Sequence, residues 1–511
     1  MNSQDLKKTK SLIGSHSSNE STLSSEPIEN RDVSKVESYA EQAVEKKAYN
    51  PKDDPNHPFN WPERKKYLAL LSISLNSFIG YFTSAIYMPA VRDIMIYFKT
   101  NLTTINATIA LFLAFNAIAP LFWAPLSERI GRRWIYIVAL VLYCVCTIVC
   151  GVATNLGLFF AFRLLQSIFA SAGQAVGGGS ISDMFEPRER GRAMGLYMLG
   201  TILGPSIAPV CGGFINQNLG WRWIFYIKTI IGGAFAILSF FLIPESLYVP
   251  AEKQVAPPAN FKERLNRLKF NPFTSLLLLS RKETAVICIP VSVGFGWFYY
   301  LVTILAPTFG EIYGFSSGTI GLCYLASGVG NITGALVSGI ASDKINNYSI
   351  KKNGGVAVQE FRLRPIYIGF PFMVIGALLY GWLLHARVHF MAPLVVGLGL
   401  FSFGLMLSIS ATNTYLIEAN TSKAASAVSL NNFTRNMCGM IFSLTGVQIR
   451  ASLGDGWSYT FAALMCLVVF SVCVPVVQKF GGKWRQEREE KEQQQQQQQK
   501  QNLQPQSQPQ S

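Results

Sequence analysis

The stretch GTILGPSIAPVCGG, residues 200–213, decides how the rest of the chain is interpreted. It lies inside an apolar run over residues 192–215, and a helix needs about 20 residues to cross a bilayer. Glycine lets neighbouring helices approach closely in lipid, where small side chains favour packing. Two prolines bend the helix, which membrane helices tolerate when neighbouring groups satisfy the freed carbonyls. The stretch therefore predicts a bent membrane helix that packs closely against other helices.

The composition is typical of a polytopic membrane protein. Half of its 511 residues are hydrophobic and only 14% are charged, which is unusual for a soluble protein of this length. The net charge of +15 is spread over short loops, so we expect no nucleic-acid partner. The nine cysteines fall mostly inside apolar runs and show no metal-ligand spacing, which predicts no metal site.

Apolar runs of spanning length recur along the chain in two sets of six. They lie at 67–90, 102–124, 134–153, 157–179, 192–215 and 223–243, and then at 284–308, 319–341, 364–385, 390–416, 424–449 and 457–476. We therefore predict an all-α polytopic membrane protein with twelve transmembrane helices. The predicted parts are a disordered tail (1–60), a six-helix half (61–243), a central loop (244–283), a second six-helix half (284–478) and a disordered glutamine-rich tail (479–511).

Lysine and arginine predict the orientation of these helices. Positive residues concentrate in the loops after the second, fourth and eighth runs and in the central loop, whereas loops after odd-numbered runs carry few. By the positive-inside rule both termini are expected in the cytoplasm.

The motif helix also carries a family resemblance. Gly200, Gly204, Pro205, Pro209, Gly212 and Gly213 form the pattern G-x-x-x-G-P-x-x-A-P-x-x-G-G. This pattern resembles the fifth-helix antiporter motif of the major facilitator superfamily, in its fungal drug:proton antiporter branch. The resemblance implies a secondary transporter in which two six-helix halves rock around a site near the midplane.

A second motif follows the second run. It reads APLSERIGRR and resembles the superfamily's loop signature G-x-L-x-D-R-x-G-R-R, and Ser342-Asp343-Lys344 after the eighth run is a partial copy. The resemblance implies a cytoplasmic gate, with Asp183 as partner of the motif arginines and Glu418 as an acid at a helix end. A carboxylate there could also cap a neighbouring helix, and positive-inside charge alone is the simpler interpretation. The predicted gate residues are Glu128, Arg129, Arg132, Arg133, Asp183, Asp343 and Glu418.

Two arginines are expected well inside the spans. Arg163 and Gln166 resemble the family's R-x-x-Q pattern in the fourth run and share a helical face with Gln174. Arg435 follows Asn432 about half-way through the eleventh run, similar to the N-N-x-x-R stretch of fungal drug exporters. An arginine in a span costs at least ~2.5 kcal/mol and usually marks a functional path, although Arg163 lies near enough to an end to snorkel.

No aspartate or glutamate lies in the middle of any run, and we expect Arg163 and Arg435 to be the only full charges there. The proton carrier is therefore unidentified, and the interior is expected to be neutral or positive. Other polar or aromatic residues that could line a cavity, each equally able to serve as packing, complete the predicted pathway: Asn76, Tyr81, Trp297, Tyr300 and Asn413.

We predict a proton-coupled exporter of small organic compounds. The expected partners are a small-molecule substrate and the lipid bilayer, with the proton gradient in place of a cofactor, and we expect a monomer in the plasma membrane or another fungal membrane such as the vacuole. The first alternative is an organic-acid or sugar facilitator or symporter, because Pro244-Glu245-Ser246 echoes a sugar-porter motif. The second is a transporter-like nutrient sensor, for which a larger tail is expected. Sequence patterns of an enzyme are absent.

Overall fold

The computed structural model describes residue 54 and residues 57–186, 189–248, 272–352, 359–420 and 424–503. Within these ranges every regular element is helical, in agreement with the predicted all-α class. Residues from Asn56 onward belong to one unit. The predicted tail 1–60 and the central loop 244–283 lie largely outside the described residues.

The N-terminal half contains the first six predicted runs as helices, because a chain in lipid must satisfy its backbone groups internally. The second and fourth runs are interrupted, at Ala119 and Ser171, and form two helices each. The first run forms α3 and ends in a short 3-10 helix, after which α4 begins. The helices of this half are α3 (Glu63–Ala85), α4 (Val91–Tyr97), α5 (Leu102–Ile118), α6 (Pro120–Ile130), α7 (Arg132–Val152), α8 (Leu156–Ala170), α9 (Ala172–Met184), α10 (Arg190–Leu219) and α11 (Trp221–Leu242), with the short η3 (Met88–Ala90) between α3 and α4.

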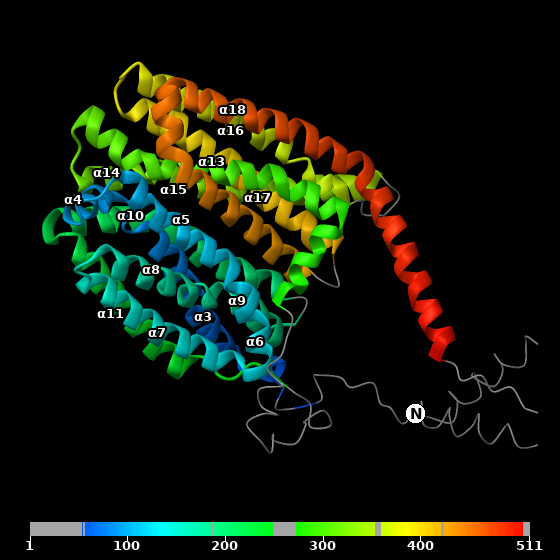
Figure 1. Cartoon of the computed structure of the whole chain (residues 1–511). Helices are drawn as coiled ribbons and strands as arrows, with labels where there is room; N and C mark the ends of the chain where they lie inside the picture. Colours follow the sequence, from blue (N-terminus) through cyan, green and yellow to red (C-terminus); the bar gives the residue numbers. More distant parts are fainter. Residues whose placement is uncertain are drawn as a thin grey trace, which may run out of the picture. The chain divides into compact units, whose positions relative to one another are not determined.

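The C-terminal half repeats this arrangement, and Figure 1 shows its yellow and orange helices grouped beside the blue and cyan helices of the first half. Its elements are η5 (Pro272–Ser280), α13 (Lys282–Tyr313), α14 (Ser317–Cys323), α15 (Leu325–Lys352), η6 (Gln359–Leu363), α16 (Ile366–His385), η7 (Pro393–Gly399), α17 (Leu400–Ala419) and α18 (Ala424–Leu503).

The last helix accounts for a difference in the number of spans. Twelve runs were predicted, whereas the described residues contain 11 helices that are long and apolar enough to cross a membrane. The difference arises because α18 contains both of the last two predicted runs. Gly454 interrupts it with φ 72° and ψ 176°, a left-handed backbone conformation that glycine adopts without steric cost. The chain therefore reverses at Gly454 between two spans.

The C-terminal tail differs from the expected disorder of 479–511. Helix α18 continues through Leu503, and Figure 1 shows its red end extending beyond the bundle. Glutamate, lysine and glutamine are good helix formers, which favours this continuation. Two arginines also fasten it to the C-terminal half, since Arg485 pairs with Glu360 and Arg488 pairs with Glu283. Residues 504–511 lie outside the described part of the chain.

Helix α7 shows how the bundle divides its surface between protein and lipid. One face carries exposed apolar side chains at helical spacing, namely Trp134, Val138, Val141, Val145, Ile148 and Val152. The other face buries Tyr136 and Tyr143, and α7 packs there against α8 and α11. An exposed apolar stripe of this length suits contact with lipid tails.

Candidate transport site and gate

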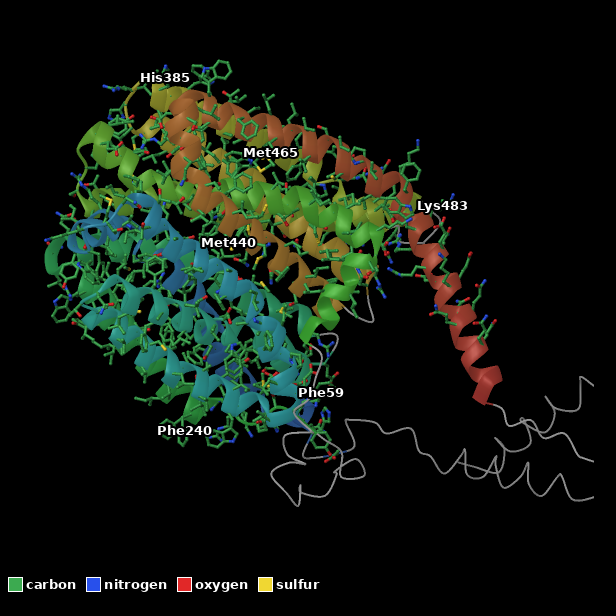
Figure 2. All side chains as sticks on the ribbon, viewed as in Figure 1. Phe59, Phe240, His385, Met440, Met465 and Lys483 are labelled. Atoms are coloured by element: carbon green, nitrogen blue, oxygen red, sulfur yellow. The ribbon has the colours of Figure 1, made fainter. Side chains whose placement is uncertain are left out.

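The predicted gate residues distinguish the two ends of the bundle. Figure 2 shows Phe59 and Lys483 toward one end of the helices and His385 toward the other. We call the first the charged end, because Arg132 and Arg362 lie at span ends there, and the second the opposite end. The positive-inside rule predicts that the charged end faces the cytoplasm.

The motif helix α10 packs against α3 through its glycines. A Cβ atom at Gly200 would lie 2.6 Å from the carbonyl oxygen of Ser74, and one at Gly204 would lie 3.0 Å from Cβ of Tyr81. At Gly212 a Cβ atom would overlap the carbonyl oxygen of Ile86. Spacings of four and eight residues place these glycines on one face of the helix. Each is therefore a position where the backbones of two helices touch.

A second face of α10 contacts the C-terminal half. Gly213 lies against Ser317 and Gly321 of α14, and the Oγ of Ser317 donates a hydrogen bond to the carbonyl oxygen of Gly213 at 3.3 Å. Pro209 also touches Gly321, and Ser206 touches Gly328 of α15. Pro205 is half-buried on the same helix. The predicted antiporter motif therefore forms a contact of small residues between the two halves, toward the opposite end.

The first set of predicted gate residues meets at the charged end of the N-terminal half. The Arg132 side chain is buried, and its Nε lies 3.0 Å from Oδ2 of Asp183 at the end of α9. Its Nη1 donates to the Oγ of Ser127 at 2.5 Å, and Nη2 lies 3.9 Å from the exposed Glu128. Asp183 is thus the close partner of Arg132, and Glu128 is a distant one.

The other two predicted arginines of this loop lie elsewhere. Arg133 donates from Nη2 to the carbonyl oxygen of Phe240 at 2.8 Å and packs over its ring, at the end of α11. Arg129 is exposed to the surface. Arg132 forms ion pairs with two of the predicted acids, Asp183 and Glu128.

The C-terminal half repeats this arrangement around a residue that was not predicted for the gate. Arg362 of η6 lies 2.7 Å from Glu418 at the end of α17 and 3.2 Å from Asp343 in α15. Arg362 thus corresponds to Arg132, Glu418 to Asp183 and Asp343 to Glu128. The repeat was hidden because residues between α15 and η6 separate Arg362 from the partial motif copy, which ends at Lys344.

This repeat gives a prediction for the two acids. Glu418→Gln should destabilise the protein by about 2 kcal/mol, because it removes a short charged hydrogen bond to a nearly buried arginine. Asp343→Asn should cost less than about 1 kcal/mol, because the Asp343 side chain is 79% exposed. Thermal unfolding in detergent measures both variants. Equal losses of stability would contradict the proposed correspondence between Glu418 and Asp183.

A carboxylate that was not predicted for this site caps the start of α7. Glu245 accepts a hydrogen bond from the backbone nitrogen of Arg132 at 2.8 Å and one from that of Arg133 at 3.2 Å. Gly131, with φ of 110°, leaves room for it, since a Cβ atom there would meet the Glu245 carboxylate. A negative group at a helix N-terminus is favourable. The expected cap therefore exists, but Glu245 supplies it from a distant part of the chain.

Arg163 lies in a buried polar network inside the N-terminal half. Its Nη1 donates to Oε1 of Gln166 at 2.6 Å, and Nε2 of Gln166 donates to the Oγ1 of Thr147 on α7 at 2.6 Å. The guanidinium packs over the rings of Tyr87 and Phe112, at 4.0 and 4.8 Å from their centroids. Arg163 is 1% exposed, and its Nε and Nη2 have no hydrogen-bond partner in the described residues. It therefore does not snorkel to the surface.

Two other predicted residues of this half lie outside the network. Gln174 comes after the interruption at Ser171, and its amide nitrogen lies beside Gly80 of α3. Asn76 donates hydrogen bonds to the carbonyl oxygen of Ser72 and to the Oγ of Ser239, both at 2.8 Å, and so joins α3 to α11. Ser171, where α8 ends and α9 begins, separates Gln174 from the hydrogen-bonded pair of Arg163 and Gln166.

Arg435 lies close to the contact between the halves. It is 9% exposed, donates from Nη2 to Oδ1 of Asn432 and packs over the ring of Phe295 at 5.0 Å. It interacts electrostatically with Tyr81, which belongs to α3 of the other half. Figure 2 shows Met440, a neighbour on the same helix, between the two groups of helices. The structure thus brings together the predicted residues Tyr81, Asn432 and Arg435.

The remaining predicted pathway residues pack within the C-terminal half. Trp297 and Tyr300 are fully buried in an aromatic cluster, with ring centroids 5.2 Å apart. Asn413 accepts a hydrogen bond from Nδ2 of Asn431 at 2.8 Å and so links α17 to α18. These contacts give all three residues a role in packing the half.

One buried charge was missed. We expected Arg163 and Arg435 alone, but Lys228 of α11 is also fully buried, with its Nζ 4.1 Å from the ring centroid of Phe225. In the described residues no ion pair involves Arg163, Lys228 or Arg435. Lys228 lies near the start of its run, where a lysine usually extends to the interface, so the sequence alone did not indicate its burial.

Two groups of membrane helices, each with an arginine–acid cluster at the same end, define the architecture of a secondary transporter. Known proteins agree with this class. The Major Facilitator Superfamily matches residues 73–443. The MFS transporter cpaT of Aspergillus oryzae is 34% identical over 466 residues, which cover 88% of this chain and 93% of that protein. The efflux pump radE of Floropilus chiversii is 30% identical over 460 residues, which cover 85% of this chain and 83% of that protein.

The fold is also that of solved transporters. A D-xylose-proton symporter superposes with a TM-score of 0.60 at 17% identity, over 79% of this chain and 97% of that one. The chain belongs to the Major Facilitator Superfamily. It is therefore a multi-pass membrane transporter and not an enzyme, as the resemblance of its motifs implied.

Proposed function

We propose that the protein exports small organic compounds in exchange for protons, by alternating access between its two halves. The name of one relative supports export, since radE is described as an efflux pump. The motif resemblance supports antiport, and the motif residues Gly213 and Pro209 lie where the halves meet. We further propose that the charged end faces the cytoplasm of a fungal plasma membrane, following the positive-inside rule.

The observation that carries the substrate class is the surroundings of Arg435. This guanidinium is buried near the contact between the halves. Within the described residues its Nε has no hydrogen-bond partner and no carboxylate pairs with it. A buried charge without a counter-charge is costly, so an acidic ligand would relieve it on binding. Phe295 supplies aromatic surface beside it, and Tyr81 of the other half interacts with it electrostatically. We propose neutral, zwitterionic or weakly acidic substrates rather than polyamines.

Transport in a host without its own drug exporters tests this proposal. We would follow the export of three compounds, with and without a protonophore. They are anionic fluorescein, neutral Nile red and the labelled polycation spermine. Arg435→Ala should reduce fluorescein export at least about tenfold, the equivalent of about 1.4 kcal/mol, and Nile red export much less. Arg92→Ala, at an exposed position on α4, is the matched control. Proton-driven export of spermine without export of any acid would contradict the proposal.

The alternative of a sugar symporter receives no support from the residues that suggested it. Glu245 of the Pro244-Glu245-Ser246 sequence caps α7 through backbone hydrogen bonds, which is a structural role. The likeness to the xylose symporter is at 17% identity and concerns the fold alone.

A further inference from the structure

Lys228 is the buried charge that the function described so far does not use. Its side chain is 0% exposed inside the N-terminal half, and its Nζ has no hydrogen-bond partner in the described residues. Phe225, one turn earlier on α11, is its aromatic neighbour. A purely structural lysine would extend to the surface or pair with a carboxylate, because an unpaired buried ammonium is costly.

Helices α7, α3 and α10 pack against α11. The charged and titratable groups that act on Lys228 belong to α7 and α8. Arg163 of α8 and Cys150 of α7 both interact with it electrostatically. The polar residues of α3 that contact α11, Ser72 and Asn76, are neutral and lie at Ser239, about three turns away. The charged or titratable neighbours of Lys228 are therefore a cation and two thiols, since Cys144 of α7 also donates to the carbonyl oxygen of Thr229 at 3.6 Å. No described acid compensates either positive charge.

Lysine and arginine differ in what they can do at such a place. A guanidinium keeps its proton under all conditions of a cell, whereas an amine can release and rebind one when it is buried. Arg163 is consequently a fixed charge, and Lys228 is the group beside it that can alternate between charged and neutral forms. None of the predicted pathway residues within the spans is an acid that could take this role.

We infer that Lys228 carries the coupling proton of this transporter, an inference that rests on the proposed proton-driven export. In each cycle the neutral Nζ would take up one proton from the side of high proton concentration and release it on the other side. The only bond made and broken is N–H, and the net charge of the half alternates by one. The proton is the co-transported ion, so no other reactant is required.

The contacts of Arg163 connect this event to the other half. When Lys228 is protonated, two like charges share one apolar region, and their repulsion acts on the Arg163 guanidinium. That group packs over Tyr87 and Phe112. Phe112 belongs to α5, which contacts α18, and Tyr87 directly precedes η3, which contacts α13 and α14. A change in the charge of Lys228 therefore acts on the surfaces through which the two halves touch.

A measurement that needs no substrate tests the inference. Spin labels at Arg192→Cys and Lys344→Cys, both exposed at the charged end of different halves, report the distance between the halves. The nine native cysteines are buried or half-buried, and protein without the introduced pair gives the background. The wild-type chain should change its distance distribution between pH 5.5 and pH 8, whereas Lys228→Gln and Lys228→Arg should each lose this change. Lys479→Gln, at an exposed position on α18, should retain it.

The arginine variant separates a proton carrier from a structural cation. If Lys228→Arg responds to pH as the wild type does, the lysine is structural and the inference is wrong. The inference also fails if Lys228→Gln keeps the response, or if the wild type has none. Protein that reaches the membrane in normal amount shows that each variant folds.

Dye export then shows whether the role of Lys228 or the proposed proton-driven export itself is wrong. If a protonophore does not affect export by the wild type, proton coupling itself is refuted. If the protonophore abolishes wild-type export but Lys228→Gln still exports against a gradient, only the role of Lys228 is refuted. We expect Lys228→Gln to lose uphill export at least tenfold while it still equilibrates the dye down its gradient.

Discussion

Gly212→Ala should reduce export at least tenfold at equal amounts of protein in the membrane. The added Cβ atom would overlap the carbonyl oxygen of Ile86, which is backbone and cannot rotate away. Overpacking of a filled contact typically costs about 1–3 kcal/mol, and about 1.4 kcal/mol corresponds to the tenfold loss. Export of fluorescein and Nile red, normalised to protein level, measures the effect.

The same helix provides the control for this substitution. Gly195 is also in α10, and a Cβ atom there would meet nothing within 4 Å. Gly195→Ala should therefore leave export unchanged or slightly improve stability, because alanine favours a helix over glycine by about 1 kcal/mol. Normal export by a well-expressed Gly212→Ala protein would show that close contact between α10 and the Ile86 backbone is not required.

Asp183→Asn should shift the balance between the two orientations of the transporter. The substitution leaves the buried Arg132 without its close carboxylate, and breaking a buried ion pair typically costs about 3–5 kcal/mol. The cost applies only to the state in which the pair is formed. The ratio of the two populations should therefore change by more than tenfold in favour of the other state. The spin-label pair at positions 192 and 344 measures the populations.

Glu128→Gln is the matched control within the same cluster. Its carboxylate lies 3.9 Å from Arg132 and is 64% exposed, so its loss should cost less than about 1 kcal/mol. The populations in Glu128→Gln should therefore resemble those of the wild type. Unchanged populations in Asp183→Asn would indicate that the arginines of this loop serve only to orient the protein in the membrane.

The sequence predicted the helical class because each span had to satisfy its own backbone in lipid. The length of the apolar runs located nearly all helices, and the glycine spacing of the motif indicated a close contact. The pattern did not reveal that one face of α10, with Gly212, meets α3 while another face, with Gly213, meets the C-terminal half. Both faces consist of small residues, so composition cannot separate them.

The sequence predicted contacts in the candidate site only between residues that belong to a family motif or lie close together in the chain. Arg163 and Gln166 are three residues apart and do form a hydrogen bond. By contrast, Glu245 reaches Arg132 across 113 positions, and the burial of Lys228 depends on where α7 packs against α11. Contacts of this kind depend on tertiary packing, and no periodicity in one segment encodes them.

The continuation of α18 past the membrane has a mechanical consequence. From Lys483 to Leu503 the helix extends about 30 Å, at 1.5 Å per residue. Because Arg485 and Arg488 attach its base to η6 and α13, the helix has to tilt together with the C-terminal half. It is a lever arm whose tip moves by about half an ångström for each degree of rocking. A fluorophore near its end would amplify a motion inside the membrane into a displacement readable in single molecules.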